Sequence, residues 1–392
     1  MTGSLTDDRI PLKTILDLVG KLDDSPGENT PRERFRVYLK NNVNNVAQLR
    51  DFIEECLRES GDQYSKALQD LINHLGKLMG FEVNYGRYQG VIGQTGYDGH
   101  WISQTKKHIV IEVKTTEVYS IKTATILSYI DALVSEKKIP ERDVALGLYV
   151  VGKPDPEINQ FESLIRAEKL IQQLRIISVN SLISLAELMN EYDVNHDDIL
   201  AIIFPSGPKI DSIVDLMSRL VAQRQLVPPT TPIDDTENKE IEPAEVTVTS
   251  KTAYWLTPIK SDDTGTAEDS VRGLVGDEKL YAFGDRTPGR KTIKPGDLIC
   301  FYATTNGVVA HAKVASYPER KPSSKIKHAE DYPWTFKLAN PKLYIDNPVV
   351  IDSELRSRLE AFKGRDVNKP WAWFVQFTHQ VSVHDFNLLT QK

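Results

Sequence analysis

Apolar residues recur at three-to-four-residue spacing through residues 9–80, which is the period of one face of an amphipathic helix. The segments ILDLV, RERFRVYL and VAQLRDFIEECL each show this spacing, and the turn sequence DDSPGENTP separates the first two. A longer apolar stripe follows in GDQYSKALQDLINHLGKLMGF, where Gly80 is placed to end the helix. The pattern predicts a series of helices ahead of a first strand in FEVNYGRY.

From residue 97 onward, strand patterns alternate with helix patterns. After a hairpin pattern, the helix segments TATILSYIDALVS, INQFESLIRAEKLIQQL and SLISLAELMNEY are separated by the apolar strand segments VALGLYVVG and RIISV. We expect the last helix to begin at a cap formed by Asn180 and Ser181. The two strands lack polar alternation, as is typical of strands buried on both faces. This order predicts an α/β fold with a mixed sheet flanked by helices.

The pattern changes again after residue 225. Residues 226–250, LVPPTTPIDDTENKEIEPAEVTVTS, combine four prolines with many acids, which is typical of a linker. Short strand segments follow in YWLTPI, DLICFYATT, GVVAHAKVA, WTFKLANPKLYI and WAWFVQFT, and they predict a β-barrel-like domain. The predicted organisation is an N-terminal helical region at 1–60, an α/β domain at 61–225, the linker at 226–250 and a β domain at 251–392.

Bulk composition limits the class of protein. At 392 residues the chain is too long for one core, so two or three domains are expected. Cys56 and Cys300 lie far apart in sequence, which argues against a disulfide framework and against a cysteine-based zinc site. No apolar run is long enough to cross a bilayer, and MTGSLTDDRIPLK lacks the apolar core of a signal peptide. We therefore expect an intracellular protein with no membrane partner.

The net charge of −7 gives no general support for binding nucleic acid, but its distribution is uneven. Residues 251–392 contain 21 Lys and Arg and 17 Asp and Glu, a net charge of +4, whereas the rest of the chain carries −11. Contacts to phosphate groups would need local basic surface. We expect that surface in the C-terminal third.

The hairpin segment YDGHWISQTKKHIVIEVKTT contains the residues with the clearest chemistry. Its second strand alternates, so its aliphatic residues share one face while Glu112 and Lys114 share the other. If residues 104–107 form the turn, Asp98 lies opposite Val113 and diagonal to Glu112 and Lys114. The two carboxylates and the acid-x-Lys triplet would then meet at one site.

Such a site would suit hydrolysis of a phosphodiester. Two carboxylates and the carbonyl of Val113 are hard oxygen ligands that fit Mg²⁺, and Mn²⁺ is expected to substitute for it. Lys114 can position a water nucleophile and oppose the charge that develops on phosphate. The alternative is an ordinary β-hairpin whose charges face solvent, because charged pairs on exposed strands are common. A carboxylate pair in a buried central sheet would favour the metal site.

At these residues the chain resembles the PD-(D/E)xK nuclease superfamily, in the branch that contains restriction endonucleases. The resemblance covers roughly residues 60–190 and rests on the helix, the GFEV strand, the D-G-x-W segment and the E-V-K strand. It implies that Asp98 and Glu112 bind metal, that Val113 lends its carbonyl and that Lys114 is catalytic. Asp70 is the candidate for an additional acid on the preceding helix. Tyr97 stands where the family often has proline.

His108 is a second candidate for a catalytic base. A lone histidine at a turn is more often structural or solvated, so both interpretations stay open.

The C-terminal domain carries a second resemblance. In KPGDLICFYATT the Lys-Pro-Gly-Asp sequence forms a turn that opens a strand. With YWLTPI, KLYAFGDRTPGR and KPWAWFV, this order is similar to the EVE domain, a relative of the YTH and PUA modules, over most of residues 251–390. Phe283-Gly284 stands where that family commonly has Trp-Gly. The resemblance implies a pocket for a flipped, chemically modified base.

A flipped base needs aromatic faces and a few polar groups, although most aromatic residues of a small β domain belong to its core. The candidate pocket residues are Trp255, Phe283, Tyr302, Thr304, Trp334 and Trp371. A basic, turn-rich segment is suited to the DNA backbone, although charge runs are usually solvated loops. Its candidate residues are Arg286, Arg290, Lys291 and Lys294.

Together these inferences predict a modification-dependent (type IV) restriction endonuclease of a prokaryotic cytoplasm, acting in defence against phage. It would flip a modified base in double-stranded DNA, with a modified cytosine such as 5-methylcytosine expected, and cut the backbone with Mg²⁺. A homodimer is expected because two strands need two active sites. The alternatives are a non-catalytic reader and a reader or nuclease of modified RNA.

Overall fold

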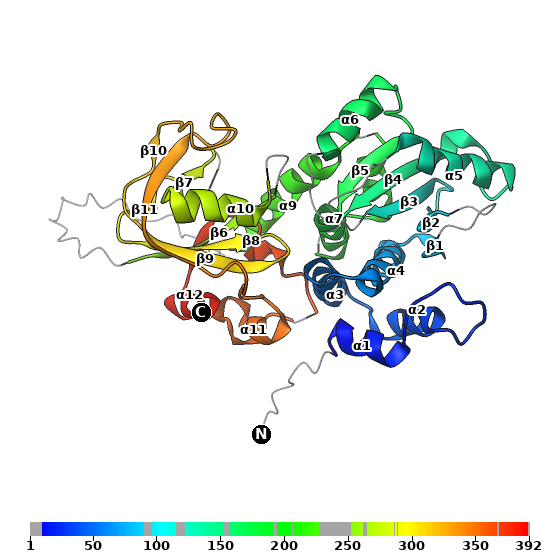
Figure 1. Ribbon diagram of the computed structural model, residues 1–392, viewed down its shortest axis with the longest axis horizontal. Coiled ribbons are helices and arrows are strands. Elements are labelled where there is room, and N and C mark those ends of the chain that lie inside the picture. The colour runs from blue at the N-terminus through cyan, green and yellow to red at the C-terminus, as the bar shows by residue number, and fades with distance from the viewer. Residues whose placement is uncertain are drawn as a thin grey trace, which may run out of the picture.

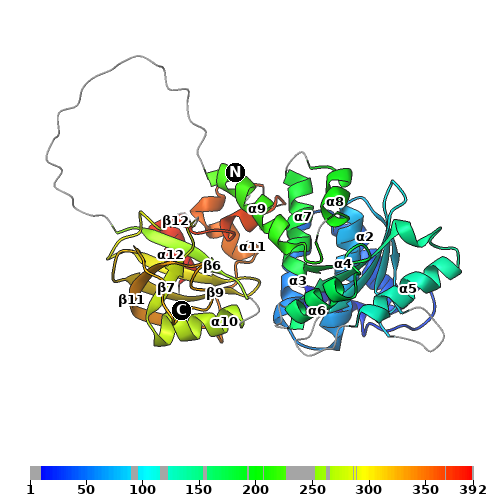
Figure 2. The same cartoon turned by 90° about the horizontal axis from the view of Figure 1, so that it is seen from above.

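Two sheets form the centres of the two parts of the chain (Figures 1 and 2). The computed structural model describes residues 10–89, 96–114, 122–152, 157–191, 194–205, 207–226, 252–261, 265–285, 287, 289–366 and 368–390. The predicted linker at 226–250 lies outside these residues except for Leu226, and Arg286 also lies outside them. The chain is a mixed α/β protein.

Within the described residues the first part contains a five-stranded mixed sheet in the order β1-β2-β3-β4-β5. The first three strands are antiparallel neighbours, and β3, β4 and β5 are parallel. The parallel strands are joined by helices, as parallel pairing requires. The strands are β1 (Glu82–Tyr85), β2 (Gly99–Ile102), β3 (His108–Lys114), β4 (Ala145–Val151) and β5 (Leu174–Ser178).

Helices precede, connect and follow these strands, and most lie where the sequence predicts them. They are α1 (Leu12–Val19), α2 (Pro31–Asn42), α3 (Val46–Arg58), α4 (Asp62–Leu78), α5 (Thr123–Ser135), the 3-10 helix η1 (Arg142–Val144), α6 (Glu157–Ala167), α7 (Val179–Glu191), α8 (His196–Ile203) and α9 (Asp211–Leu226). The helices α8 and α9 are not among the predicted elements.

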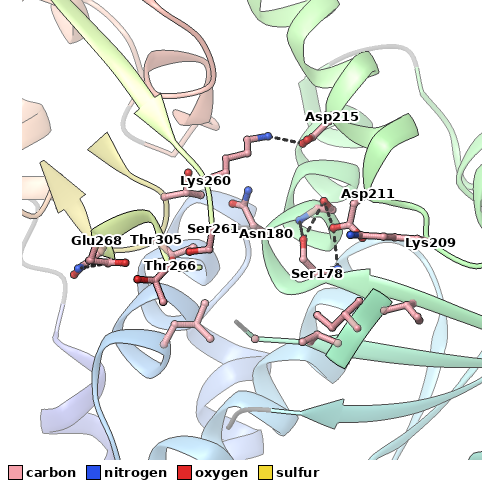
Figure 3. Close-up of a pocket in the computed structure, with 18 of the residues that line it drawn as sticks. Ser178, Asn180, Lys209, Asp211, Asp215, Lys260, Ser261, Thr266, Glu268 and Thr305 are labelled. Atoms are coloured by element: carbon pink, nitrogen blue, oxygen red, sulfur yellow. Dashed lines mark hydrogen bonds and ion pairs between the residues drawn. The ribbon is translucent and has the colours of Figure 1, made fainter. Parts of the chain in front are cut away.

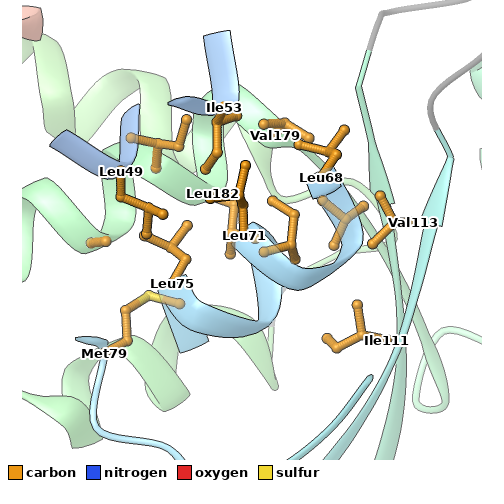
Figure 4. Packing of buried hydrophobic residues seen from close by; sticks show 14 of the residues in the cluster. Leu49, Ile53, Leu68, Leu71, Leu75, Met79, Ile111, Val113, Val179 and Leu182 are labelled. Carbon is orange, nitrogen blue, oxygen red and sulfur yellow. The ribbon is translucent and has the colours of Figure 1, made fainter. Parts of the chain in front are cut away.

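Helices cover both faces of the sheet. One face carries Ile109, Ile111 and Val113 of β3 and packs in one cluster with α4 and α7 (Figure 4). The other face packs against α5 and α6, which contribute Ile130 and Phe161. Burial on both sides explains why every residue of β4 is buried and why its sequence shows no polar alternation.

The N-terminal helices α1, α2 and α3 belong to the same hydrophobic cluster as α4 and the sheet. Leu12, Phe35 and Ile53, one from each helix, are at most 2% exposed within that cluster. Residues 1–60, predicted as a separate helical region, therefore share their core with the α/β domain as far as they are described.

Two helix boundaries differ from the prediction. The cap of α7 is Ser178, whose Oγ accepts a hydrogen bond from the amide of Ser181 at 3.1 Å, so the helix begins before the predicted Asn180-Ser181 cap. The helix α6 ends at Ala167, because Lys169 takes a left-handed conformation (φ 57°), which ends a helix.

Within the described residues the second part is built on a curled seven-stranded sheet (Figure 1) in the order β10-β11-β9-β8-β6-β12, with β7 paired to β11. Its strands are β6 (Tyr254–Ile259), β7 (Leu280–Phe283), β8 (Leu298–Ala303), β9 (Gly307–Val314), β10 (Glu319–Arg320), β11 (Trp334–Leu343) and β12 (His379–Val381). Its helices are α10 (Ala267–Ser270), the π-helix η2 (Val271–Asp277), α11 (Ser353–Arg358), the 3-10 helices η3 (Glu360–Phe362) and η4 (Ala372–Phe374), and α12 (Val383–Leu389).

The Lys-Pro-Gly-Asp segment forms the predicted turn before β8. Gly296 has φ +99°, a conformation that favours glycine, and the amide of Asp297 donates to the carbonyl of Lys294 at 3.1 Å. The Asp297 carboxylate is fully buried and accepts from the amides of Ala253 and Lys294 and from Nε1 of Trp255, at 3.0–3.1 Å. This aspartate therefore ties the turn to β6.

The strand predicted in WAWFVQFT is wrong. Residues 372–374 form η4, and the neighbouring strand β12 starts only at His379. In a strand, consecutive side chains would point to opposite faces. The 3-10 turn instead lets the consecutive residues Trp373, Phe374 and Val375 all enter one hydrophobic cluster.

The two parts of the chain are docked through specific ion pairs, and α9 lies on the side facing the second part (Figure 2). Arg356 of α11 makes a bidentate contact with Asp51 of α3, at 3.0 and 2.8 Å. The Nζ of Lys260 lies 2.7 Å from Oδ1 of Asp215 on α9. A bidentate, largely buried guanidinium–carboxylate pair fixes orientation as well as distance.

Among the described residues, no helix has the length and apolar character that crossing a membrane requires.

Candidate active site

The hairpin of β2 and β3 brings Asp98, the residue just before β2, close to Glu112. Gly99 pairs with Ile111 at the end of the ladder. The amide of Asp98 donates to the carbonyl of Ile111 at 3.1 Å. The ladder pairs Ile102 with His108, so the predicted register of the hairpin is wrong by one residue. The carboxylate of Asp98 nevertheless lies close enough to Glu112 for the charge of Glu112 to raise its pKa.

The turn length explains this shift. Ser103 donates its amide to the carbonyl of Lys107 at 2.9 Å, which leaves a three-residue loop at 104–106 in place of the predicted 104–107. Lys106 has φ 59°, so the loop is a turn followed by a left-handed residue, a common three-residue hairpin connection. A one-residue change in a hairpin loop changes which side chains face each other.

Both carboxylates are buried. Asp98 is 8% exposed and Glu112 is 7% exposed, whereas the side chain of Lys114 is 27% exposed. The Nζ of Lys114 lies 2.6 Å from Oε1 of Glu112. The alternative of a hairpin with solvent-facing charges is therefore wrong for the two acids. Only the lysine reaches the surface.

Asp98 is held in place by several hydrogen bonds. Its Oδ2 accepts from the amide of Val113 at 2.7 Å. Its carbonyl oxygen accepts from Nδ2 of Asn73 on α4 at 2.8 Å and from the amide of Gly86 at 2.9 Å. The aspartate is thus fixed from both the strand and the helix side. Such support limits the movement of its carboxylate.

The electrostatics of the pair are unfavourable. Burial, and next the charge of Glu112, raise the pKa of Asp98 well above its usual value, while the amide of Val113 and then Lys114 oppose that shift. Burial also raises the pKa of Glu112, against the effect of Lys114. Oε2 of Glu112 is buried and has no hydrogen-bond partner among the described residues. A proton or a cation would relieve this arrangement.

These residues fit Mg²⁺, which is commonly held by one or two carboxylates and keeps several waters. The unpaired Oε2 of Glu112 is the observation that supports the fit. Within the described ranges, no group of three or more His, Cys, Asp or Glu residues is placed to hold a metal ion. The candidate cation site therefore rests on two acidic side chains.

Asp70, the candidate helix acid, lies on α4 and is 1% exposed. Arg36 makes a bidentate contact with it, at 3.0 Å for each oxygen, and the hydroxyl of Tyr88 donates to it at 2.6 Å. It is close enough to Asp98 to raise the pKa of that residue, as the smallest of the causes. The structure thus brings Asp70 near the site but engages its carboxylate elsewhere.

Two tyrosines near the carboxylates were not foreseen. Tyr149 lies beside Glu112 in the parallel register of β3 and β4, and Tyr129 comes from α5. Burial, followed by the charge of Glu112, raises the pKa of both hydroxyls. Helix periodicity marks Tyr129 as part of α5 but does not show which strand residue it meets.

His108 is not placed to act as a base at this site. It lies four residues before Glu112 on β3, which is roughly 13 Å along a strand. Its Nδ1 is 2.9 Å from Nε2 of His100, and both rings are buried. Burial lowers the pKa of His100 to about 4 and also lowers the pKa of His108. The pair is structural and neutral at pH 7.

The six candidate base-pocket residues are not gathered in one cavity. Trp255 and Phe283 are at most 3% exposed in one hydrophobic cluster, and Trp334 packs against that cluster. Tyr302 and Trp371 are equally buried in a different cluster. Most of these aromatics therefore serve as core residues, which is the usual role of aromatics in a small β domain.

Trp371 serves the junction between the two parts of the chain. Its ring centre lies 5.7 Å from the guanidinium of Arg50 on α3 and 4.6 Å from that of Arg356 on α11. Arg50 is in turn held by Glu187 of α7, with contacts of 2.7 and 3.0 Å. A ring that is 2% exposed and lies close to two guanidinium groups has little face left for a base.

Trp334 is the most accessible of the candidate aromatics. Its Nε1 donates to Oδ1 of Asp285 at 2.7 Å, and the guanidinium of Arg290 lies 6.0 Å from its ring centre. Lys291 is exposed and Lys294 is half-buried in the same segment, between β7 and β8. The structure thus places one tryptophan near Arg290, one of the four predicted DNA-backbone residues.

Thr304 lines a cleft of about 500 Å³ between the two parts of the chain (Figure 3). The α/β part contributes Val151 and Ser178, at the ends of β4 and β5. Val151 is paired with Lys114 on one side and with Ser178 on the other. The cleft therefore begins one strand away from the candidate catalytic lysine. This cleft was not foreseen, because its two walls are far apart in sequence.

The fold and the site define a mixed α/β protein that carries a buried acidic pair and a docked, curled β domain. Neither a protein-family model nor a curated protein sequence matches this chain. Function is therefore inferred from the geometry of the site and the chemistry of its residues.

Proposed function

We propose that this protein is a Mg²⁺-dependent endonuclease whose cutting depends on a modified base in DNA, that is, a modification-dependent (type IV) restriction endonuclease. The observation that carries the proposal is the acidic pair. Asp98 and Glu112 are 8% and 7% exposed, the charge of Glu112 raises the pKa of Asp98, and the ammonium of Lys114 contacts Glu112. Two buried carboxylates facing each other oppose folding unless a cation or proton joins them.

In this proposal Asp98 and Glu112 hold the metal ion, with the carbonyl of Val113 as a further ligand. Bound Mg²⁺, or Mn²⁺ in its place, would neutralise phosphate charge and lower the pKa of water. The amide of Val113 fixes the orientation of the Asp98 carboxylate through its 2.7 Å hydrogen bond. Lys114, which is partly exposed, would orient a water nucleophile and oppose the charge that develops on the phosphate.

The C-terminal domain is proposed to recognise the modified base, and a modified cytosine is expected. Trp334 is the aromatic residue proposed to stack on a base, because it is half-buried and Arg290 lies near its ring. Arg290, Lys291 and Lys294 would bind the phosphate backbone. This role does not need the buried residues Trp255, Phe283, Tyr302 and Trp371.

Docking of the two parts changes how cleavage would be directed to the mark. A flexible tether would only raise the effective concentration of the nuclease near the modified base. The contact of Arg356 with Asp51 and that of Lys260 with Asp215 instead hold the domains in one arrangement. We therefore expect cutting within a narrow range of distances from the mark.

A homodimer is part of the proposal, because cutting both strands needs two active sites. The N-terminal helices are the proposed contact. Leu18 of α1 is 75% exposed and Val37 of α2 is 53% exposed, which leaves apolar surface on that side.

The deciding experiment is a cleavage assay with Mg²⁺ on matched duplexes. They carry unmodified cytosine, 5-methylcytosine, 5-hydroxymethylcytosine or N6-methyladenine, and modified RNA of the same sequence is tested in parallel. We expect cutting of one modified DNA only. Failure to cut any of these substrates would refute the proposal, and cutting of RNA alone would favour the RNA alternative.

Lys114→Ala should abolish cutting and leave binding of modified DNA unchanged. Lys313→Ala is the matched control, because Lys313 is exposed on β9 in the other part of the chain. A calorimetric titration of the DNA-free protein with Mn²⁺ adds a second readout. Binding that is lost in Glu112→Gln supports the acidic pair as the metal site, and binding that is unaffected by this change contradicts it.

A further inference from the structure

The cleft between the two parts of the chain has the size and position of a ligand site. Its volume is about 500 Å³, within the range of roughly 300–1,000 Å³ that is common for small-molecule pockets. One wall comes from the ends of β4 and β5 and from α7 and α9, and the other from the start of the C-terminal domain and the turn between β8 and β9 (Figure 3). Clefts at domain junctions are frequent binding sites.

The charges that line the cleft are balanced. Arg58, Lys209 and Lys260 are matched in number by acidic residues on the two walls. Those acids are Asp211, Asp215 and Glu268. A phosphate group would meet these carboxylates as well as the cations. The lining therefore does not favour an anion.

The cleft also lacks a stacking surface. None of its lining residues within the described part of the chain is aromatic. Its apolar floor comes from Leu57, Val151, Ile158 and Ile176. A planar base gains most of its binding from aromatic faces, so a base by itself has little to bind here.

Hydrogen-bond donors and hydrogen-bond acceptors both remain available around the cleft. Nζ of Lys209 has no partner among the described residues, and Oδ1 of Asn306 is free while its Nδ2 donates to Oε1 of Glu268 at 2.7 Å. Asn180 uses its Oδ1 to accept from Arg50 and keeps its NH₂ group. Donors and acceptors therefore line the same space.

Such a lining matches a ligand whose groups both donate and accept. A hydroxyl can do both at once, so neighbouring hydroxyls can pair with amides, carboxylates and ammonium groups together. We propose that the cleft binds a neutral, hydroxyl-rich sugar, carried either by a modified base of a nucleic acid or by a free ribonucleoside. A sugar on a modified base would be part of the nuclease substrate, so this source rests on the proposed function.

The site would be coupled to catalysis by position. Lys114, Val151 and Ser178 follow one another across β3, β4 and β5 in the same row, so a sugar in the cleft lies two strands or fewer from the lysine. The ion pair of Lys260 with Asp215 bridges the two walls (Figure 3). A ligand that contacts both walls would stabilise the docked arrangement of the domains.

The test is calorimetric binding to the intact, metal-free protein, so that no cutting is required. One arm compares duplex DNA carrying glucosylated 5-hydroxymethylcytosine with the same duplex carrying 5-hydroxymethylcytosine. The other compares cytidine with 2′,3′-dideoxycytidine. In at least one arm the ligand with more hydroxyls should bind at least about tenfold more tightly, since unpaired polar groups in the site penalise the poorer ligand. Equal affinity within both pairs overturns the proposal.

Variants locate the effect in the cleft. Lys209→Ala and Asn306→Ala should each reduce the preference about tenfold, and Lys313→Ala, outside the cleft, should not change it. Thermal denaturation confirms that each variant is folded, and Lys209 is exposed enough to be replaced without loss of packing. A preference that persists in both cleft variants overturns the proposal. If the wild-type protein prefers the ligand with more hydroxyls but cuts none of the DNA substrates, only the proposed nuclease activity is refuted.

Discussion

Replacing Asp98 by asparagine should stabilise the metal-free protein. The asparagine side chain would keep an oxygen to accept the 2.7 Å hydrogen bond from the amide of Val113, but the substitution would remove the charge that faces Glu112. The charge of Glu112 lies close enough to raise the pKa of Asp98. Two unit charges ~5 Å apart repel by ~3 kcal/mol at an effective dielectric constant near 20. We expect a net gain of about 1–3 kcal/mol at pH 8.

The gain should depend on pH. The pKa of Asp98 in the folded protein is raised above its usual value of 3.8, so between these two values the folded state binds more protons than the unfolded state. The free energy of unfolding of the wild-type protein therefore falls as pH rises through the folded pKa. Asp98→Asn lacks this fall. The gain in stability of Asp98→Asn over the wild-type protein is therefore absent near pH 4, grows as pH rises and is complete above the folded pKa of Asp98.

The measurement is urea denaturation in EDTA at pH 4, 6 and 8. Asp297→Asn is the control, because Asp297 is also fully buried but its carboxylate accepts three hydrogen bonds from N–H groups. That variant should lose about 1–3 kcal/mol at pH 8, since an amide cannot accept all three. If Asp98→Asn is also destabilised at pH 8, the carboxylates of Asp98 and Glu112 are not in conflict and the reasoning fails.

Three further predictions concern the frame around the site. Gly76→Ala should cost about 2–3 kcal/mol in urea denaturation, because the added Cβ would lie 2.6 Å from the buried ring of Trp101; an unchanged midpoint would contradict this packing. Glu187→Gln should cost ~3 kcal/mol, because the buried Arg50 then keeps Glu54 as its carboxylate partner, and replacing Arg50, Glu54 and Glu187 together by methionine should recover most of that loss. Burial lowers the pKa of His100 to about 4. The contribution of the neutral His100 to the free energy of unfolding is therefore fully present above pH ~6.5 and is lost as pH falls toward 4. His100→Gln should remove that part of the pH dependence, on the order of 1–3 kcal/mol, and an unaltered pH profile would argue against it.

The sequence determined the elements whose signal is local. The three-to-four-residue spacing predicted α2, α3 and α4, and Gly80 ends the last of them with φ +88°. Alternation in IVIEVK placed Glu112 and Lys114 on the face opposite Val113, which the structure confirms. Turn residues before β8 were equally readable, because Gly296 and Asp297 act within a few residues of one another. Each of these signals depends on neighbours along the chain.

The tertiary structure decided which of these residues are buried and what they meet. The register of β2 with β3, which brings Asp98 near Glu112, depends on one left-handed residue, Lys106, in the hairpin loop. The burial of both acids depends on helices that cover the sheet from other parts of the chain.

The sequence also did not show which aromatic residues of the C-terminal domain are buried. Trp334 and Trp371 have the same side chain, yet one lies near the surface and the other is buried close to two arginines at the domain junction. Arg356 and Asp51, whose contact helps to form that junction, are separated by 305 positions. Periodicity carries information over a few residues, whereas burial and pairing are set by contacts between distant segments. For that reason the sequence could name the candidate chemistry, and only the folded chain could show which groups face each other.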